Sequence, residues 1–210
     1  MGKEVNQMDK RNIFVIGDSV SIHYGPYLKT NVKDKFEYDR KRGIEQAIID
    51  LDSPIGANAG DSVMVMDYLA KEYTRNTKYD ILLINCGLHD VRRDRTLNKV
   101  QVELNDYKIN LRKIINLANL MAYKTIWVGL TPVIDKIHNS RTEGVLRYSK
   151  DVYAYDIAAK EIMGKYNIQC IDMYNFTRNL GRDIYLDHVH FKEKIRELQA
   201  KFIAGYLNGI

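Results

Sequence analysis

The sequence predicts an α/β protein in which a parallel sheet carries helices on both faces. Short apolar runs typical of buried strands alternate with longer segments whose apolar residues recur at helical spacing, and no internal repeat or low-complexity segment interrupts this alternation. The 210 residues suffice to bury a core, and no linker rich in Pro, Gly or Ser divides them. We therefore expect a loose tail over residues 1–11 and a single domain over 12–210.

The first half of the chain begins with a β-favouring apolar run. Residues 13–16 are expected to form a buried strand, which a glycine turn joins to a helix over 20–29. Residues 35–39 predict a second strand, and their charges suit the edge of a sheet. Helical spacing continues over 44–52, and Ser53-Pro54 ends it because proline disfavours helical geometry in the residue before it.

The second half repeats the alternation after a loop of small residues at 56–62. The clearest buried strand is expected at 79–87, and a strand over 125–130 is broken by Thr131-Pro132. The remaining expected elements are helices over 63–73, 99–121, 145–165 and 191–207 and a strand over 168–171.

Charge and composition narrow the classes of partner. The formal net charge is +5, and lysines and arginines are interleaved with acidic residues, so even the densest run, 39–42, is best explained as a solvated face. No nucleic-acid-binding motif accompanies the charge, and we expect no nucleic-acid partner. Oligomeric state is left open by the sequence.

The positions of the cysteines and the hydropathy of the chain indicate the cellular compartment that we expect for the protein. Cys86 and Cys170 lie in or beside apolar strand-like runs, which suits buried reduced thiols better than a disulfide. The N-terminal residues are polar, and no apolar run approaches membrane-spanning length. We expect a soluble cytoplasmic protein that neither spans nor binds a membrane.

The sequence Gly17-Asp18-Ser19 places a serine at the carboxyl end of the first strand, where open α/β sheets bind ligands. Gly17 permits a tight turn, and the helix that follows would direct the backbone N–H of Ser19 at an incoming anion. Ser19 is therefore a candidate nucleophile. The alternative is that Asp-Ser is ordinary turn and N-cap chemistry.

A serine nucleophile needs a base, and the base needs a partner that fixes its tautomer. Asp187 can provide that partner for His190 across one turn of chain, just before the last helix. The alternative is an aspartate that caps this helix beside a surface histidine. Gly60 precedes another helix, and its N–H could face the oxygen that becomes negative when Ser19 attacks a carbonyl; otherwise it is a flexible loop glycine.

Together these segments resemble the GDSL or SGNH hydrolase family, whose blocks occur here in order across nearly the whole chain. The matching segments are Gly17-Asp18-Ser19, Asn58-Ala59-Gly60, Gly87-Leu88-His89-Asp90 and Asp187-His188-Val189-His190. The resemblance implies a three-layer α/β/α sandwich of five parallel strands in flavodoxin-like order. It also implies an esterase without metal or organic cofactor, with Ser19 as nucleophile, His190 as base, Asp187 as its orienting carboxylate, and an oxyanion hole formed by Ser19 and Gly60. No Gly-x-Ser-x-Gly elbow surrounds the serine, so the chain differs from α/β-hydrolases.

His89 departs from the family pattern, which has an asparagine whose amide completes the oxyanion hole. A neutral imidazole donates one N–H and replaces that amide only in the right tautomer. In the alternative, His89 packs in its loop while Ser19 and Gly60 form the hole alone.

Other candidate residues carry weaker signals. His23, His138 and His188 with Asp18 or Asp187 could be assembled into a metal site, but no pair has structural-zinc spacing. Tyrosines 148, 153 and 155 fall on one expected helix, where packing is favoured over a sugar platform. Residues 138–141 are expected in a loop that either borders the substrate cleft or is a solvated turn.

The expected function is a small serine esterase that removes short acyl groups, acetyl above all, from a carbohydrate or another polar small-molecule ester. The carbohydrate substrate rests on family analogy, since function lies in the site more than in the fold. Two alternatives remain: an acyltransferase or thioesterase that uses the same triad, and a catalytically silent ligand-binding domain. A compact domain with short loops is expected to leave an open cleft that disfavours long-chain lipids.

Overall fold

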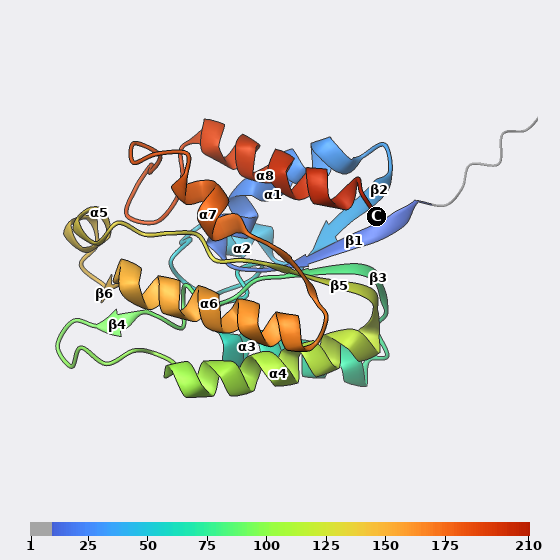
Figure 1. Ribbon diagram of the computed structural model, residues 1–210, viewed down its shortest axis with the longest axis horizontal. Helices are drawn as coiled ribbons and strands as arrows, with labels where there is room; N and C mark the ends of the chain where they lie inside the picture. Colours follow the sequence, from blue (N-terminus) through green and yellow to red (C-terminus); the bar gives the residue numbers. More distant parts are fainter. Residues whose placement is uncertain (1–9) are drawn as a thin grey trace, which may run out of the picture.

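The computed structural model describes residues 10–210 as a parallel sheet between two layers of helices (Figure 1). The sheet strands are β1 (Arg11–Ile16), β2 (Phe36–Arg40), β3 (Tyr79–Ile84), β5 (Ala122–Val128) and β7 (Gln169–Ile171). They lie in the order β2-β1-β3-β5-β7, and every neighbouring pair is parallel. Counted along the sheet this is the 2-1-3-4-5 order of flavodoxin-like folds, which confirms the predicted fold class.

The long helices cover both faces of the sheet. On one face α1 (Ser19–Val32) packs against α8 (Glu193–Leu207) (Figure 1). On the other face α4 (Leu104–Met121) packs between α3 (Ser62–Thr74) and α6 (Ser149–Lys165). Three short helices complete the chain: α2 (Ile44–Ala47), α5 (Asp135–Arg141) and α7 (Met173–Arg178).

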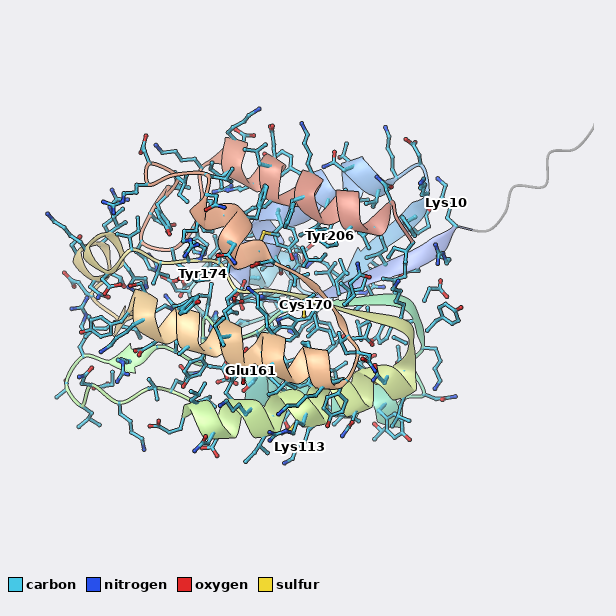
Figure 2. The ribbon with its side chains drawn as sticks, viewed as in Figure 1. Lys10, Lys113, Glu161, Cys170, Tyr174 and Tyr206 are labelled. Atoms are coloured by element: carbon cyan, nitrogen blue, oxygen red, sulfur yellow. The ribbon has the colours of Figure 1, made fainter. Side chains whose placement is uncertain are left out.

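The core lies around the interior strands of the sheet. β3 and β5 are flanked on both sides by other strands and covered by both helical layers, so their apolar residues lose nearly all contact with water. Residues 81–84 and Trp127 are fully buried. Most charged side chains lie outside this core, as Figure 2 shows for Lys10 beside the start of β1 and Lys113 on α4, both exposed.

Three predicted boundaries are wrong because contacts or turns outside the local pattern compete with the expected helix. Over 44–52 only α2 is helical, because the chain turns at Asp50, whose side chain and carbonyl accept the N–H groups of Asp52 and Ser53. The helix expected from residue 99 begins at Leu104. The helix expected from residue 145 begins at Ser149.

The last two corrections share one cause. Strand β4 (Arg93–Asp94) pairs antiparallel with β6 (Val145–Leu146), which takes residues 145–146 out of the expected helix. Arg93 also bridges to Val100 across a turn in which Asn98 has φ 50°. This small second sheet joins two loops at the end of the main sheet where its strands finish (Figure 1).

The ends of the other elements shift by smaller amounts. β1 begins at Arg11, so the expected tail includes one strand residue; residues 1–9 of that tail lie outside the described part of the chain. β2 lies at the edge of the sheet, as its charges predict. The short helices α5 and α7 were not predicted.

Both cysteines are free thiols, as expected. Cys86 is fully buried just after β3, as predicted, whereas Cys170 in β7 is half-buried and not buried as predicted (Figure 2). Among residues 10–210, no helix has the length and apolar character needed to cross a bilayer.

Candidate active site

The first predicted site residue, Ser19, lies where β1 passes into α1. Gly17 forms the turn between them, and a Cβ at this position would lie 2.9 Å from the Cβ and Oγ of Ser21, too close for any other residue. Asp18 caps the helix by accepting the Val20 N–H at 3.0 Å. Ser19 is thereby the first residue of α1, and its own N–H has no acceptor within the helix. Its side chain is buried beside the helix terminus.

The structure brings Asp187, His190 and Ser19 together in one line of hydrogen bonds. The Nε2 atom of His190 lies 2.8 Å from Ser19 Oγ, and its Nδ1 atom lies 2.8 Å from Asp187 Oδ2. The other carboxylate oxygen, Oδ1, accepts the backbone N–H groups of Val189 and His190 at 2.8 and 2.7 Å. Asp187 therefore folds its own loop into an Asx turn, which is why a three-residue spacing suffices to place the carboxylate against the ring.

The same contacts set the charge of Asp187. Burial opposes ionisation, but the hydrogen bonds from the His190 ring and from the two backbone amides outweigh it and hold the pKa of Asp187 below its ordinary value. The carboxylate is therefore ionised at neutral pH. It fixes the Nδ1–H tautomer of His190, which leaves Nε2 free to accept the proton of Ser19.

Gly60 lies in the loop before α3 and requires glycine. Its φ is +73°, and a Cβ would lie 2.5 Å from Met64 Sδ and 2.9 Å from Pro54 Cβ. Its N–H donates to Asn58 Oδ1 at 3.1 Å. The amide predicted to bind an oxyanion thus has an acceptor within its own loop, and a reacting oxygen would have to share or replace that acceptor.

His89 lies in the loop that follows β3 and is buried, with 2% of its surface exposed. Its Nε2 atom lies 3.4 Å from Arg92 Nη2, and its Nδ1 atom has no hydrogen-bond partner among residues 10–210. Burial, followed by the charges of Arg92 and Arg147, lowers the pKa of His89 well below its ordinary value. The imidazole is therefore neutral at neutral pH and carries one donor.

The loops of Gly60 and His89 are joined by Asp90. Its two carboxylate oxygens lie 3.1 and 3.0 Å from the backbone N of Ser62, the first residue of α3. Burial raises the pKa of Asp90 to about 7, and the hydrogen bonds from Ser62 oppose that shift. This contact fixes the loop before α3 against the loop after β3, beside the switch point where doubly wound sheets bind ligands.

Three further residues at the site were missed by sequence reasoning. Arg92 Nη2 donates to the carbonyl of Asp52, whose Oδ1 atom lies 3.1 Å from His188 Nε2. Arg147 is buried and donates through Nε to the carbonyl of Leu88 at 2.7 Å. None of the three belongs to a recognisable motif, so only the folded loops identify them.

Four of the five histidines form a row of neighbouring rings that includes His190. His23, one helical turn after Ser19, has its ring centroid 4.9 Å from that of His190, and His188 lies 4.9 Å from His138. Burial lowers the pKa of His23 to about 3 and that of His138 to about 4. Within the described chain, no group of three or more His, Cys, Asp or Glu side chains is placed to hold a metal ion.

The remaining candidates, residues 138–141 and three tyrosines, make contacts with neighbouring loops and helices. Residues 138–141 belong to α5 and not to a loop, and Arg141 Nη1 donates to the carbonyl of Asp187 at 3.0 Å. Tyr155 donates to the Val102 carbonyl, and Tyr153 lies against Tyr174. Tyr148 precedes α6. Of these three tyrosines only Tyr155 is buried, in agreement with the packing role; Tyr153 is 47% exposed.

Comparison with known proteins decides the family. The model of the family described as GDSL-like Lipase/Acylhydrolase matches residues 13–203. The chain belongs to this family. Membership confirms the predicted GDSL-type serine esterase class, and the match spans the four sequence blocks and all of the main sheet from Ile13 onward. A search of curated proteins gave no match.

Solved structures of similar fold support the architecture. The lipase/acylhydrolase from Enterococcus faecalis is 17% identical, with 95% of this chain and 96% of that chain covered and a TM-score of 0.72. A variant of Axe2, an acetyl xylan esterase from Geobacillus stearothermophilus, is 13% identical, with 92% of each chain covered and a TM-score of 0.67. The carbohydrate acetylesterase Est24 from Sinorhizobium meliloti is 13% identical, with 95% and 99% covered and a TM-score of 0.59.

A partly apolar cavity of about 560 Å³ adjoins the catalytic side of this GDSL-like acylhydrolase. It is lined by Ile22, His23 and Pro26 of α1 and by Ile44 and Ile48 in and just after α2, among others. Since His23 contacts the ring of His190, this cavity begins one side chain away from the catalytic histidine.

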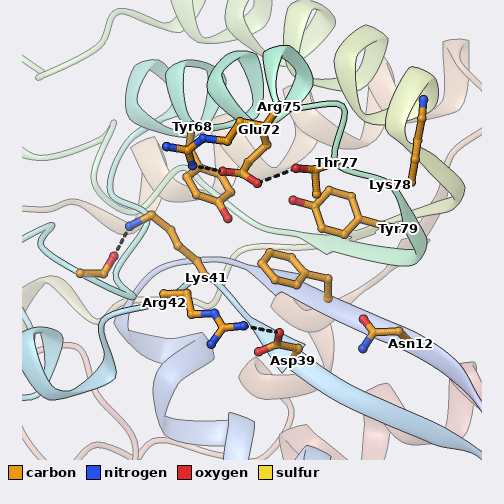
Figure 3. Close-up of a pocket in the computed structure, with 12 residues that line it drawn as sticks. Asn12, Asp39, Lys41, Arg42, Tyr68, Glu72, Arg75, Thr77, Lys78 and Tyr79 are labelled. Atoms are coloured by element: carbon orange, nitrogen blue, oxygen red, sulfur yellow. Dashed lines mark hydrogen bonds and ion pairs between the residues drawn. The ribbon is translucent and has the colours of Figure 1, made fainter.

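A larger cavity of about 680 Å³ lies elsewhere, along β1, β2, β3 and α3 (Figure 3). The rings of Tyr68 and Tyr79 lie beside each other in it, and two of its charged pairs neutralise each other, Arg42 with Asp39 and Arg75 with Glu72. No predicted site residue lines it.

Proposed function

We propose that this GDSL-family esterase hydrolyses short acyl esters, acetyl esters above all, through an acyl-serine intermediate. The observation that carries the proposal is the continuous pair of 2.8 Å contacts from Asp187 through His190 to Ser19 Oγ. A hydroxyl at this distance from a neutral imidazole can transfer its proton as it attacks a carbonyl carbon.

The steps follow from the atoms in contact. Ser19 Oγ attacks the ester carbonyl while His190 Nε2 takes its proton, and Asp187 stabilises the imidazolium that results. The tetrahedral intermediate expels the alcohol, which receives that proton from His190. A water molecule then attacks the acyl-serine with the same assistance, which releases the carboxylic acid and restores the hydroxyl of Ser19.

The negative oxygen of the intermediate needs donors already in place. In this proposal the Ser19 N–H supplies one donor from the first turn of α1, and the Gly60 N–H supplies a second when the oxyanion displaces Asn58 Oδ1. His89 supplies the third through Nδ1–H, a buried donor without a protein partner in the described residues.

The proposed substrate is a short acyl ester of a carbohydrate or another small polar alcohol. The acetylesterase names of two structural relatives support this class, and so does the limited room beside the nucleophile turn. The cavity lined by Asp18, Val20 and Leu88, among others, holds only about 10 Å³, enough for one water molecule. An acyl chain cannot extend into the fold there.

We expect kcat/KM to fall by about 10-fold or more from p-nitrophenyl acetate to p-nitrophenyl octanoate, since the void beside the nucleophile turn has no room for a longer chain. The measurement is a series of acetate, butyrate and octanoate esters of one leaving group, followed by acetylated xylan fragments with release of acetate. A rise in kcat/KM with chain length would contradict the short-acyl assignment, and equal acetate release from a sugar and a simple alkyl acetate would remove the carbohydrate preference.

Substitution of His89 tests the third donor. His89→Ala is expected to lower kcat by about 10² to 10³, the usual effect of removing one oxyanion donor, with a much smaller change in KM. His89→Asn should recover part of the loss, because an amide offers the same kind of donor without a tautomer requirement.

The deciding measurement is kcat against pH for the wild type and both variants on one activated acetate ester, with thermal unfolding in parallel. Near-equal kcat in all three proteins would remove His89 from the oxyanion hole. A packing residue would change the melting temperature more than kcat and leave the shape of the pH profile unaltered.

A further inference from the structure

One side chain links the loop of His89 to the loop before α3. Arg92, three residues after His89, donates through Nη2 to the carbonyl of Asp52 and places the same atom 3.4 Å from His89 Nε2. Asp52 in turn contacts His188 through its carboxylate. Arg92 is thus anchored by backbone on one side and faces the imidazole on the other.

This contact selects one tautomer of His89. A guanidinium has only donors, so the Nε2 atom that faces Arg92 must present its lone pair. The single proton of the neutral ring then lies on Nδ1. That atom is buried and has no acceptor among residues 10–210, although buried donors in folded proteins are almost always paired. An acceptor that arrives with the substrate would satisfy it.

The charge of Arg92 acts in the same direction as its hydrogen bond. A positive group beside the ring disfavours the imidazolium form, and burial of His89 adds to this effect. His89 therefore stays neutral with one proton. A second guanidinium, that of Arg147, binds the carbonyl of Leu88 next to His89 and reinforces the effect.

We infer that Arg92 is a positioning residue that holds His89 as the Nδ1–H tautomer, so that a histidine and an arginine together replace the amide donor that the family pattern has at this position. The inference rests on the proposed oxyanion role of His89. An asparagine amide needs no such partner, because its donor is fixed by covalent structure. Arg92 is therefore required only while position 89 is histidine.

A double-mutant cycle tests this dependence. Arg92→Met in the wild-type background is expected to lower kcat on p-nitrophenyl acetate by about 10-fold, with KM changed less than about 2-fold. In the His89→Asn background the same substitution should change kcat by less than about 2-fold. Arg92→Lys, which keeps a donor-only cation, should fall between the wild type and Arg92→Met.

Arg95→Met is the matched control. Arg95 is exposed in the same loop, donates to the carbonyls of Asn139 and Thr142, and does not touch His89, so its loss should leave kcat unchanged. Thermal unfolding of every variant identifies any that fails to fold. If Arg92→Met fails to fold, the cycle uses Arg92→Lys in the wild-type and His89→Asn backgrounds in place of Arg92→Met.

Nitrogen-15 NMR of the histidine rings reads the tautomer directly and requires no turnover. The wild type should show His89 as Nδ1–H, and Arg92→Met should show a mixture of both tautomers. An Nε2–H ring in the wild type, or an equal loss of kcat from Arg92→Met in both backgrounds, would overturn the inference.

The kcat values of His89→Ala and Arg92→Met distinguish failure of the proposed oxyanion role of His89 from failure of the positioning role of Arg92. If His89→Ala keeps wild-type kcat, then His89 is not an oxyanion donor, and the role of Arg92 is rejected with it. If His89→Ala loses activity while Arg92→Met does not, only the positioning role of Arg92 is rejected.

Discussion

Replacement of Ser19 by alanine is expected to abolish ester hydrolysis, with a loss in kcat of about 10⁶, the scale at which a serine protease loses its nucleophile. The physical reason is that the remaining groups cannot form an acyl-enzyme: His190 loses the hydroxyl 2.8 Å from Nε2 and can only assist water. Covalent labelling by a serine-directed phosphonate should disappear with the hydroxyl. The measurements are turnover of p-nitrophenyl acetate and the mass of the intact protein after labelling.

Ser21→Ala is the matched control for this substitution. Ser21 lies two residues later in α1, is buried, and donates to the Asp18 carbonyl at 2.6 Å, so its replacement costs stability but removes no reacting atom. It should keep most of the wild-type kcat and still take the label, with peptide mapping placing the adduct on Ser19. Turnover that persists unchanged in Ser19→Ala, with its fold intact by circular dichroism, would exclude the serine mechanism.

The strand-to-helix turn that holds Ser19 could be predicted because its signals are local. An apolar run over 13–16, a glycine and a capping aspartate follow one another in sequence, and the structure uses each of them there. The buried strand before His89 is equally clear, since β3 is covered on both faces and needs apolar residues at nearly every position. These two elements place the candidate nucleophile and His89 at the same edge of the sheet.

The helix boundaries that the sequence misplaced depend on partners distant in the chain. Residues 145–146 have helical apolar spacing, yet they pair with 93–94 as a strand, and nothing within 145–165 indicates that partner. Likewise the apolar spacing over 44–52 continues through a turn that the Asp50 side chain stabilises instead. The apolar spacing within one segment does not show whether a strand or a turn will replace the helix, because contacts elsewhere in the fold decide between them.

The contacts of the candidate site are likewise of two kinds, those within one loop and those between loops distant in the chain. The contact between Asp187 and His190 is made within one short loop, so the sequence spacing of these two residues was enough to predict it. Arg92 reaches His89, Asp52 reaches His188, and Arg147 reaches the Leu88 carbonyl beside His89, each from a separate loop. Their positions follow from the β4–β6 pairing and from the turn after α2. The sequence therefore predicted the three residues of a catalytic triad but not the residues that support His89.

His190→Ala is expected to fall close to the Ser19→Ala level, with a loss in kcat of about 10⁵ to 10⁶, because without the imidazole no group takes the proton of Ser19. Asp187→Asn should lose about 10⁴, since an amide no longer fixes the Nδ1–H tautomer or stabilises the imidazolium. The pKa of Asp187 lies below its ordinary value, so the carboxylate stays ionised through the working pH range. The measurement is kcat of each single variant on p-nitrophenyl acetate at several pH values.

The double variant Ser19→Ala/His190→Ala should lose no more than either single variant, because residues that act as a unit are not additive. His188→Ala is the control. The ring centroid of His188 lies 5.9 Å from that of His190, and His188 contacts Asp52 and Asp187 but not Ser19. The expected loss in kcat is therefore less than about 10-fold. If His190→Ala retains most of the wild-type kcat while His188→Ala does not, the base is His188, and the line of contacts from Asp187 through His190 to Ser19 does not carry the proton.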